Sequence, residues 1–355
     1  MDSFFPLPTS DPTTIYRYRD GLYAVDMLTT ALAHLDFFTW LDGHPSNLQT
    51  ICESFHIHER PADVMLTLFV SMGLIETKDA KFHLSTLARE HLVKGSSWNI
   101  TPYFASLKDR PVCRDLITVL RTGKPASWGS FDHEKAWAKA MEEDAFASQF
   151  TAAMDCRGSY LAPALAEKLD CRDLNHLLDV AGGSGIYACA FADRHPQLKA
   201  TVLERPPVDR IAREKIRSRG FAERVVVHVA DMFKDPFPSG CDVHLFSNVL
   251  HDWDVPRVRQ LLAKSFEALL PGGLLIIHGA HINASKTGPL PVAAYSTLLM
   301  TITEGKCYSQ GEMRDMLLEA GFGNFSFVPS VADRSVITAR KGTRDGLPSN
   351  PIEAH

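Results

Sequence analysis

The sequence feature that most constrains the fold is a short apolar run that ends in a cluster of glycines. Residues 177–180 read Leu-Leu-Asp-Val, and Gly182, Gly183 and Gly185 follow after one alanine. This pattern predicts a buried strand that turns sharply into a helix, because glycines permit the tight turn. The first turn of a helix presents unpaired N–H groups, so an anionic group of a ligand is favoured there. Many α/β turns carry glycines without binding anything, so the motif alone leaves the ligand open.

Strand-like and helical segments alternate from this turn onward. The expected strands are Leu177–Val180, Ala200–Leu203, Val225–Val229, Val243–Phe246 and Leu274–Ile277, and the intervening helices include Val208–Arg219 and Val255–Leu270. Alternation of this kind predicts an α/β fold whose parallel strands are joined by right-handed crossovers, hence a doubly wound, mostly parallel sheet. Ligands of such sheets bind at the carboxyl ends of the strands.

The N-terminal part predicts a helical module that ends in a small hairpin. The expected elements are helices over residues 16–41, 47–52 and 61–73, the last with Pro61 as its first residue and Gly73 as terminator, and a hairpin over 74–84. In the first helix, apolar residues that include Leu22 and Val25 recur at steps of three or four, which is typical of a helix that buries one face. This is the order of a winged-helix module. Such modules often bind DNA, but residues 61–73 contain no Lys or Arg, so a structural or dimerising role is favoured.

Composition bounds the class of protein. The 355 residues, 45% of them hydrophobic, suffice for two domains with a sizeable core. The net charge of −5 gives no electrostatic case for nucleic acid or an anionic membrane. Seven scattered cysteines without a Cys-x-x-Cys pair favour a reducing compartment over disulfides or structural zinc. No basic, apolar leader opens the chain and no run of about 18 apolar residues occurs, so we expect a cytoplasmic protein.

Polar residues stand at the predicted strand ends. Glu204 closes the second strand, where a carboxylate can accept hydrogen bonds from both hydroxyls of a ribose. Asp231 follows the third strand with Met232 and Phe233 beside it, so a carboxylate and apolar neighbours can hold the edge and the face of an adenine. The glycine turn and Glu204 alone fit either a nicotinamide or an S-adenosylmethionine site. The position of the turn after a helical domain, the Asp231 element and residues 251–253 favour the second.

Five short motifs, taken together, resemble the dimeric small-molecule O-methyltransferases, which include plant caffeic-acid type enzymes, acetylserotonin O-methyltransferase and microbial natural-product relatives. The motifs are residues 178–185, 230–233, 249–253, 270–273 and 319–322. The resemblance covers nearly the whole chain and is specific for the superfamily rather than for a substrate. It implies a Rossmann-like methyltransferase sheet, S-adenosylmethionine as cofactor, and a homodimer formed through the N-terminal domain.

The resemblance also implies a division of the chain and a set of cofactor contacts. The expected segments are a winged-helix-like dimerisation domain (1–100), a helical connector that contributes to the substrate pocket (101–170), the S-adenosylmethionine-binding domain (171–341) and a flexible tail (342–355). The predicted cofactor-binding residues are Asp179, Gly183, Gly185, Glu204, Asp231, Met232, Phe233 and Asn248. In this scheme the methionine end of the cofactor lies against the glycine turn, and Asn248 stands where relatives often carry a cation.

The resemblance also implies that His251 is the general base. Methyl transfer is an in-line displacement, so the acceptor hydroxyl must be aligned with the methyl group and must lose its proton. A phenol with a pKa of about 10 is a poor nucleophile at neutral pH, and a histidine titrating near about 6.5 is a natural acceptor for its proton. Asp252 is predicted as a second catalytic residue. The alternatives are that His251 caps a helix or satisfies a buried polar group, and that Asp252 is a cofactor-side or helix-start carboxylate.

Two positions depart from the family pattern. Gly279 and Cys307 stand where relatives place glutamates, and neither residue can orient an imidazolium through a carboxylate. His281 and Glu304 are candidates to substitute, although a surface role for His281 and a structural one for Glu304 fit as well. These departures motivate a second hypothesis, an enzyme of the same fold that binds S-adenosylmethionine but catalyses a pericyclic or related non-methylating reaction.

The substrate is expected to be a small aromatic or polyketide-like secondary metabolite that carries a hydroxyl. Its predicted contacts are Phe150, Met154, Trp253, Met300 and Thr303, although each of them fits a core position equally well. No clustered carboxylates at the strand ends demand a metal, so none is predicted. A winged-helix DNA binder with a ligand-sensing domain and a nicotinamide oxidoreductase remain as further alternatives.

Overall fold

The computed structural model describes residues 4–126 and 141–342, and the chain divides into two compact units. We call residues 1–13, 138–279 and 312–355 the sheet unit, and residues 14–137 and 280–311 the helical unit. This division differs from the segments expected from the sequence, because residues 280–311 belong with the N-terminal helices. Of the expected tail, only Gly342 lies within the described residues.

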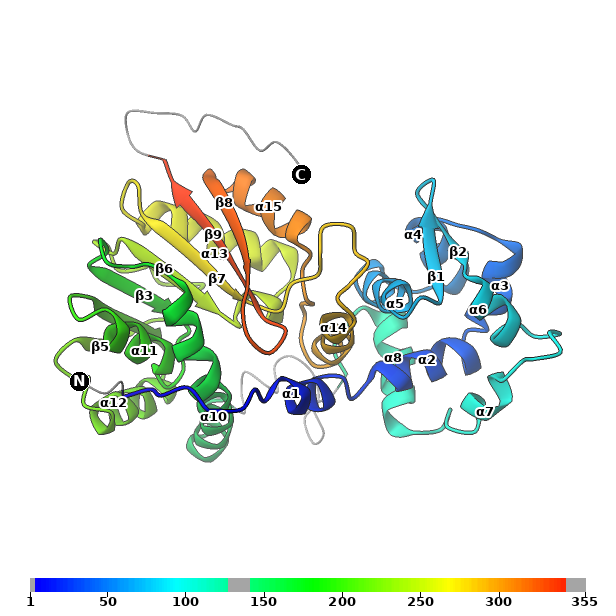
Figure 1. Ribbon diagram of the computed structural model, residues 1–355, viewed down its shortest axis with the longest axis horizontal. Coiled ribbons are helices and arrows are strands. Elements are labelled where there is room, and N and C mark those ends of the chain that lie inside the picture. The colour runs from blue at the N-terminus through cyan, green and yellow to red at the C-terminus, as the bar shows by residue number, and fades with distance from the viewer. Residues whose placement is uncertain (1–3, 127–140, 343–355) are drawn as a thin grey trace. The chain divides into compact units, whose positions relative to one another are not determined.

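The helical unit consists of short helices and one hairpin (Figure 1). Its elements are α1 (Thr13–Asp20), α2 (Ala24–Ala33), α3 (Phe37–Gly43), α4 (Leu48–Phe55), α5 (Glu59–Ser71), β1 (Ile75–Lys78), β2 (Lys81–Leu84), α6 (Thr86–His91), α7 (Thr101–Ala105), α8 (Pro111–Thr122) and α14 (Leu290–Ile302). Asn47 caps α4 by accepting a hydrogen bond from the Thr50 N–H, which satisfies one of the unpaired donors of the first turn. β1 and β2 pair antiparallel. The predicted order of helices followed by a hairpin is confirmed.

The single helix expected over residues 16–41 is wrong. Three helices occupy this stretch, and Asp36, with a left-handed φ of 51°, separates α2 from α3. Leu22, in the turn between α1 and α2, and Val25, in the first turn of α2, are 57% and 54% exposed, so neither is buried in the core as the helical pattern predicts. Pro61 is the third residue of α5 rather than the first, and Gly73, with a φ of 71°, follows the helix end as expected.

The C-terminal helix of this unit, α14, packs against α5. The Arg60 guanidinium of α5 donates to the carbonyl oxygens of Met300 (3.1 Å), Thr303 (3.2 Å) and Gly305 (2.8 Å), and so satisfies groups at the end of α14 that have no partner within the helix. Most residues of α5 are buried. In a DNA-binding winged helix the corresponding helix lies in the DNA groove, whereas α5 packs against other elements of its own unit.

Asp63, one turn after Arg60, forms ion pairs on both sides of α14. Its carboxylate lies 2.7 Å from the Lys286 ammonium, which precedes the helix, and 2.5 Å from the Lys306 ammonium, which follows it. The side chains of Asp63 and Lys306 are only 16% and 10% exposed. We call Arg60, Asp63, Lys286 and Lys306 the α5 brace, because they hold both ends of α14 in place.

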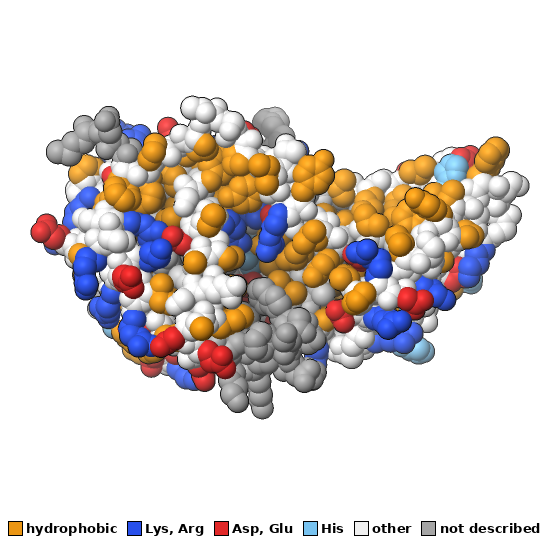
Figure 2. Space-filling view, turned by 90° about the horizontal axis from the view of Figure 1, so that it is seen from below, with side chains coloured by type: hydrophobic (Ala, Val, Ile, Leu, Met, Phe, Trp, Pro, Cys, Tyr) orange, Lys and Arg blue, Asp and Glu red, His pale blue; other side chains and the backbone are white. Residues whose placement is uncertain are grey.

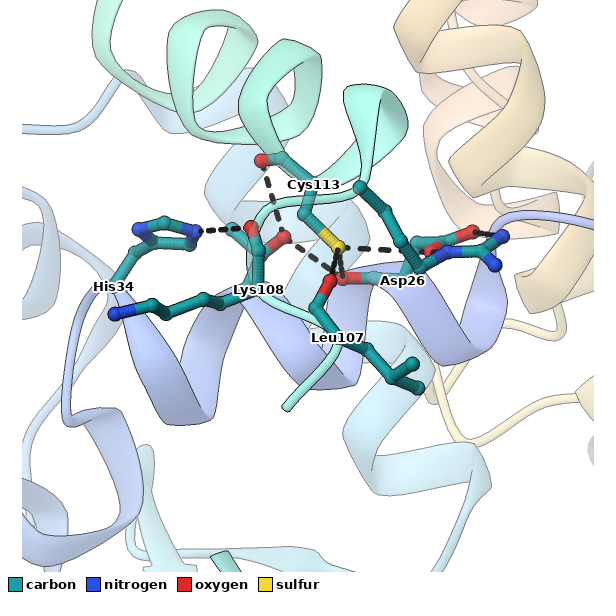
Figure 3. A network of polar contacts seen from close by, with 7 residues as sticks. Asp26, His34, Leu107, Lys108 and Cys113 are labelled. Atoms are coloured by element: carbon teal, nitrogen blue, oxygen red, sulfur yellow. Dashed lines mark hydrogen bonds and ion pairs between the residues drawn. The ribbon is translucent and has the colours of Figure 1, made fainter. Parts of the chain in front are cut away.

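Figure 3 shows a polar network that joins α2 to the segment that leads into α8. The buried Asp26 carboxylate accepts a hydrogen bond from Arg110 (2.7 Å), and the Cys113 Sγ lies 3.6 Å from the same carboxylate. About two helical turns further on, just past the end of α2, the His34 Nε2 lies 3.0 Å from the carbonyl oxygen of Lys108. Burial raises the pKa of the Cys113 thiol, so this group stays protonated and serves packing.

The sheet unit holds, within the described residues, one sheet of seven strands in the order β5-β4-β3-β6-β7-β9-β8. Its strands are β3 (His176–Val180), β4 (Lys199–Glu204), β5 (Val225–Val229), β6 (Val243–Ser247), β7 (Leu274–Gly279), β8 (Phe322–Pro329) and β9 (Ser335–Lys341). The first five are parallel, as predicted. Strand order reverses between β3 and β6, and ligands of doubly wound sheets bind at the carboxyl ends of the strands beside such a point.

β8 and β9, which the sequence analysis did not anticipate, pair antiparallel at the β7 edge. Gly321, with a φ of 94°, precedes β8, and a Cβ there would lie 2.9 Å from the Phe266 ring. The mostly parallel character of the predicted sheet is therefore confirmed, with an antiparallel pair added at one end.

Helices cover both faces of the sheet (Figure 1). They are α10 (Asp144–Lys168), α11 (Ile186–Arg194) and α12 (Val208–Ser218) on one face and α13 (Val255–Ala268) and α15 (Gln310–Glu319) on the other. α10 and α11 pack so closely that a Cβ on Gly158 would lie 2.5 Å from a methyl carbon of Ile186. Within the described ranges, no helix is long and apolar enough to cross a membrane.

Candidate cofactor and catalytic site

The glycine turn between β3 and α11 requires backbone conformations that most side chains disfavour. Gly183 and Gly185 adopt φ values of 58° and 72°, and a Cβ on Gly182 would lie 2.6 Å from the Asp179 carboxyl. Ala181 also adopts a positive φ, 52°, which costs about 1 kcal/mol for a residue with a Cβ. The sharp glycine turn from β3 into α11 is therefore confirmed, and the approach of a ligand to its backbone stays a prediction.

Glu204, at the end of β4, lies against the turn. Its Oε1 accepts a hydrogen bond from the Gly183 N–H (2.9 Å), and its Oε2 accepts one from the Arg205 N–H (3.1 Å). Each carboxylate oxygen keeps a second lone pair for a ligand donor. Burial raises the pKa of Glu204 to about 7 against the opposing effect of these N–H groups.

Asp179, the third residue before Gly182, is almost completely buried. Its Oδ2 accepts a hydrogen bond from the Ala188 N–H (3.3 Å), and its Oδ1 has no partner among the described residues. Burial, opposed by the Ala188 N–H and assisted by the charge of Glu204, raises the pKa of Asp179 to about 7. Two carboxyls thus share the carboxyl ends of neighbouring strands, and at least one buried oxygen lacks a donor.

The loop after β5 is fixed by its own hydrogen bonds and by a lysine of α13. The Asp231 carboxylate accepts a hydrogen bond from the Phe233 N–H (2.9 Å) and pairs with Lys234 (3.3 Å). Burial opposes these contacts, but they keep the pKa of Asp231 below its usual range. On α13, Lys264 donates to the Met232 carbonyl oxygen (2.6 Å), so the backbone between Asp231 and Phe233 is fixed.

An aromatic and cationic stack adjoins this loop. The rings of Phe233 and Trp253 meet edge to face with centroids 4.6 Å apart, and the Arg257 guanidinium lies 4.5 Å from the centroid of Phe233 and 5.6 Å from that of Trp253. Trp253, predicted as a substrate contact, therefore contacts the residue predicted for adenine. Arg257 is absent from the sequence prediction, because no motif marks it.

Asn248, after β6, is buried and adopts a φ of 56°. Its amide donates to the hydroxyls of Tyr187 (3.3 Å) and Ser247 (3.2 Å), and its Oδ1 has no partner among the described residues. A strained residue with an unpaired buried acceptor is typical of a ligand site. Tyr187, in the first turn of α11, is a further residue that the sequence analysis missed.

His251 and Asp252 lie in a short 3₁₀ helix, η1 (Leu250–Asp252), that follows β6. His251 is buried, and its Nε2 lies 3.7 Å from the Asp252 Oδ1. Burial raises the pKa of Asp252 to about 7, and the positive charge of Arg157 on α10 acts in the opposite direction. Asp252 does not cap the following helix, because Asp254 accepts the capping hydrogen bond from the Arg257 N–H (3.0 Å).

The unpaired groups fit a ligand that donates hydrogen bonds and carries positive charge. Among the described residues, the buried oxygens without a partner at the ends of β3 and β6 are Asp179 Oδ1 and Asn248 Oδ1, and both are acceptors. The carboxyls of Asp179 and Glu204 lie beside the turn. A cationic cofactor with ribose hydroxyls and an ammonium group matches this set, whereas a pyrophosphate would meet buried carboxyls. S-adenosylmethionine therefore fits these residues better than a nicotinamide dinucleotide. Among the described residues, no group of three or more His, Cys, Asp or Glu is arranged to hold a metal ion.

The predicted substrate residues belong to both units. Phe150 and Met154 lie partly buried on α10 of the sheet unit. Met300 and Thr303 belong to the helical unit, where Met300 has no exposed surface and packs in the apolar core, and the Thr303 hydroxyl donates to the Leu299 carbonyl oxygen (2.8 Å). The substrate contacts remain predictions, and Met300 as seen here is a core residue.

Gly279 and Cys307, which stand where the family has glutamates, lie in the sheet unit and in the helical unit respectively. Gly279 ends β7, and Cys307 is buried in the core of the helical unit, where its N–H donates to the Ser296 hydroxyl (3.1 Å). His281 is buried, which lowers its pKa to about 4, so its imidazole is neutral at pH 7. Glu304 is partly buried in the same unit.

Comparison with known proteins agrees with this geometry. The sequence profile of the O-methyltransferase domain family matches residues 114–323. The 3-hydroxy-5-methyl-1-naphthoate 3-O-methyltransferase of Streptomyces sahachiroi is 29% identical over 87% of this chain and 89% of its own length. A crystal structure of an O-methyltransferase family 2 protein from Planctomyces limnophilus, in complex with apigenin, is 31% identical, covers 96% of this chain and 99% of that chain, and has a TM-score of 0.86. Aclacinomycin 10-hydroxylase of Streptomyces purpurascens is 32% identical over 58% of this chain and 55% of its own length.

A doubly wound sheet with a glycine turn, a carboxylate at the end of the neighbouring strand and buried acceptors without a described partner is the arrangement expected of an α/β methyltransferase. Together with the match over residues 114–323, this means that the chain belongs to the O-methyltransferase family and that its cofactor is S-adenosylmethionine. The predicted fold class and cofactor are thereby confirmed. The individual site residues stay predictions.

Proposed function

We propose that the chain transfers a methyl group from S-adenosylmethionine to a hydroxyl of a small aromatic or polyketide-like metabolite, with His251 as the general base. The observation that carries this proposal is the group of residues that follows the parallel strands: the glycine turn, Glu204, Asp231 and Asn248, with His251 three residues beyond Asn248. A relative that methylates a hydroxynaphthoate and a structural neighbour in complex with apigenin support a polycyclic phenol as acceptor.

The chain's own residues divide the work. Glu204 would accept hydrogen bonds from the ribose hydroxyls. The Asp231 loop and the rings of Phe233 and Trp253 would contact the adenine. Asp179 and Asn248 each offer an oxygen that can accept a hydrogen bond from the cofactor. When bound, the cofactor supplies an electrophilic methyl group to an oxygen held in line with it. His251 accepts the proton of that oxygen. The Asp252 carboxylate, 3.7 Å from the His251 Nε2, stabilises the imidazolium once it is ionised, and so supplies a charge that Gly279 and Cys307 do not.

We propose that the acceptor lies against predicted substrate residues of the sheet unit. Phe150 and Met154 are the first candidates, because both side chains are partly buried on the helix that carries Arg157, whose charge acts on Asp252. Met300 and Thr303, in the helical unit, stay predictions, and Met300 packs in the core of that unit. Substituting Met154 by Ala is expected to raise the KM for the acceptor more than the KM for the cofactor.

The direct experiment follows the label from methyl-labelled S-adenosylmethionine into a panel of hydroxynaphthoates, flavones and hydroxyanthraquinones. The proposal predicts a labelled methyl ether and an equal amount of S-adenosylhomocysteine. Absence of label from every phenol in the panel, with the cofactor bound, would count against it.

A second candidate is a non-methylating reaction in the same site. Two observations favour it: Gly279 and Cys307 replace the glutamates of the family pattern, and one relative is named as a hydroxylase. This candidate predicts cofactor binding without stoichiometric S-adenosylhomocysteine. Formation of that product together with a methylated native substrate would end it.

We also propose that the chain forms a homodimer through the helical unit. Ile15, Tyr18, Leu22 and Val25 are between 54% and 79% exposed and recur at intervals of three or four along α1 and α2. Figure 2 shows hydrophobic side chains gathered on one face of the right-hand, helical unit. The substitution Tyr18→Glu is expected to convert a dimer to a monomer in light scattering, whereas a wild-type chain that already runs as a monomer would contradict the proposal.

We propose the cytoplasm as the location, because seven scattered cysteines without a Cys-x-x-Cys pair favour a reducing compartment. Detection of the native chain outside a reducing compartment would overturn this assignment.

A further inference from the structure

Three elements meet at Asp155, on the outer side of the glycine turn. The Asp155 carboxylate of α10 accepts a hydrogen bond from the Ser184 hydroxyl at 2.5 Å, and it pairs with the guanidinium of Arg219, which follows α12. The Lys215 ammonium of α12 lies 3.9 Å from the other carboxylate oxygen. The side chains of Asp155 and Arg219 are only 14% and 11% exposed, so this ion pair is shielded from competing water.

Arg219 also contacts the backbone of the turn. One guanidinium nitrogen binds Asp155, while the other donates to the Ser184 carbonyl oxygen at 3.2 Å. Ser184 is therefore held at two points, through its hydroxyl and through its carbonyl group. A guanidinium can reach both acceptors at once because its donors are arranged as a rigid fork, whereas an ammonium is a single point.

The glycine turn depends on neighbouring residues to hold its conformation, because its own glycines make no side-chain contacts. Gly183 and Gly185 have no side chains to pack, and both adopt positive φ values. On the inner side, the Gly183 N–H is held by Glu204. On the outer side, Asp155 and Arg219 hold Ser184, and the close packing of Gly158 against Ile186 keeps α10 from shifting along α11.

We propose that Asp155, Arg219 and Ser184 form a clamp that positions the glycine turn for the amino-acid end of the cofactor. The proposal rests on the cofactor placement proposed above, in which that end lies against the turn. Asp155 and Arg219 are positioning residues, because they act through Ser184 rather than on the cofactor. The clamp also links the turn to α10, on which Met154 immediately precedes Asp155.

The clamp is tested by binding calorimetry with two ligands. S-adenosylmethionine carries the amino-acid end, and 5′-methylthioadenosine keeps the adenosine but lacks that end. Ser184→Ala removes one hydrogen bond, and Arg219→Lys keeps the charge but removes the fork. Each variant is expected to bind S-adenosylmethionine about tenfold more weakly, the size expected for one hydrogen bond, and to bind 5′-methylthioadenosine as the wild type does.

The chain offers a matched control. Asp144 and Arg210 form a second ion pair between α10 and α12 at 2.6 Å, but their side chains are 72% and 66% exposed and do not contact the turn. Asp144→Asn should leave both affinities unchanged. Asp231→Ala, in the adenine loop, should weaken both ligands.

The outcomes separate the clamp from the cofactor site itself. Unchanged affinity for S-adenosylmethionine in Ser184→Ala and Arg219→Lys overturns the clamp, and so does an equal loss for both ligands, which indicates general loosening. If Asp231→Ala also binds both ligands normally, the proposed cofactor site fails as well. Asp155→Asn adds a thermal test: a lower melting temperature with unchanged affinity for S-adenosylmethionine means that the ion pair is structural only.

Discussion

The α5 brace and the strand-end residues of the sheet unit use the same kinds of side chain in opposite ways. In the brace, Asp63 pairs with two lysines, and Arg60 donates to backbone carbonyl oxygens. At the strand ends, Asp179 and Asn248 each have a buried oxygen without a partner in the described part of the chain, and burial raises the pKa values of Asp179 and Glu204 to about 7. The brace is complete within the chain, whereas the strand-end group is completed by a ligand.

A buried polar group that lacks a partner costs free energy in the folded protein. Such groups also occur away from the strand ends, for example Thr29 Oγ1 in the helical unit. They indicate a ligand at the strand ends because two of them lie beside the glycine turn. The third helix of a winged-helix module suggests nucleic acid from its position alone, but Arg60 and Asp63 of α5 are bound by groups of their own unit. The glycine turn suggests any anion from its sequence alone, but its unpaired acceptors favour a cationic ligand.

The largest effect is expected on the rate of methyl transfer, from a substitution at the proposed catalytic site. His251→Ala removes the proposed base, so kcat should fall by about 10² to 10⁴, while the affinity for S-adenosylmethionine changes little. Single-turnover kinetics and calorimetry check the two quantities. A rate that stays within about twofold of the wild type would mean that the hydroxyl loses its proton to another group.

The substitution Asp63→Ala tests whether the α5 brace stabilises the fold. This change leaves the nearly buried Lys306 without its carboxylate, so the free energy of unfolding should fall by about 3 to 5 kcal/mol. Urea denaturation measures the loss. Asp42→Asn, at an exposed pair with Arg89, is the matched control and should cost less than about 1 kcal/mol. If Asp63→Ala kept wild-type stability but lost affinity for the cofactor, the α5 brace would be part of the functional site rather than of the structural framework.

The raised pKa values predict two pH effects of intermediate size. The pKa values of Asp179 and Glu204 are about 7 in the folded protein, against about 4 in an unfolded chain, so the folded protein holds protons that the unfolded chain has released between these values. The stability of the cofactor-free protein should therefore fall as pH rises from about 4 to about 7 and level off above that. Denaturation at a series of pH values tests this.

The second pH effect concerns binding. A cofactor whose hydroxyls donate to an ionised Glu204 favours the deprotonated form, so its binding should release protons near pH 7 and strengthen as pH rises from about 6 to about 8. Calorimetry in two buffers with different heats of ionisation measures the release. Glu204→Gln should reduce it, and proton uptake in the wild type would contradict the assignment.

The smallest effect is expected at Ala181. Its φ of 52° costs a residue with a Cβ about 1 kcal/mol, but glycine also gains freedom in the unfolded chain. Ala181→Gly should therefore change the free energy of unfolding by less than about 1 kcal/mol and leave cofactor affinity near the wild-type value. A large loss of affinity would show that the Ala181 methyl group contacts the cofactor.

The sequence predicted the features that follow from local pattern. The five parallel strands, the glycine turn and the carboxylates at strand ends were all visible, because apolar period and turn residues determine them. β8 and β9 were missed, and so was the return of residues 280–311 to the helical unit, because both depend on contacts between distant segments. The break in the helix expected over 16–41 depends on Asp36, whose left-handed conformation has no strong sequence signal.

Within the site, motif residues were easier to predict than their supports. Glu204 and Asp231 stand at predictable strand ends. Asp155, Arg219, Arg257 and Tyr187 come from helices whose facing surfaces only the packed sheet defines, so no spacing in the sequence relates them. Trp253 was expected at the substrate, and its contact with Phe233 became visible only when the two loops were placed together.

The most direct test of the account is a crystal structure with S-adenosylhomocysteine and a phenolic acceptor that the label assay identifies. The account predicts the ribose at Glu204, the amino-acid end at the turn around Ser184, and the acceptor oxygen within about 3.2 Å of a His251 ring nitrogen. A cofactor bound elsewhere, or an acceptor oxygen that His251 does not reach directly or through one water, would contradict it.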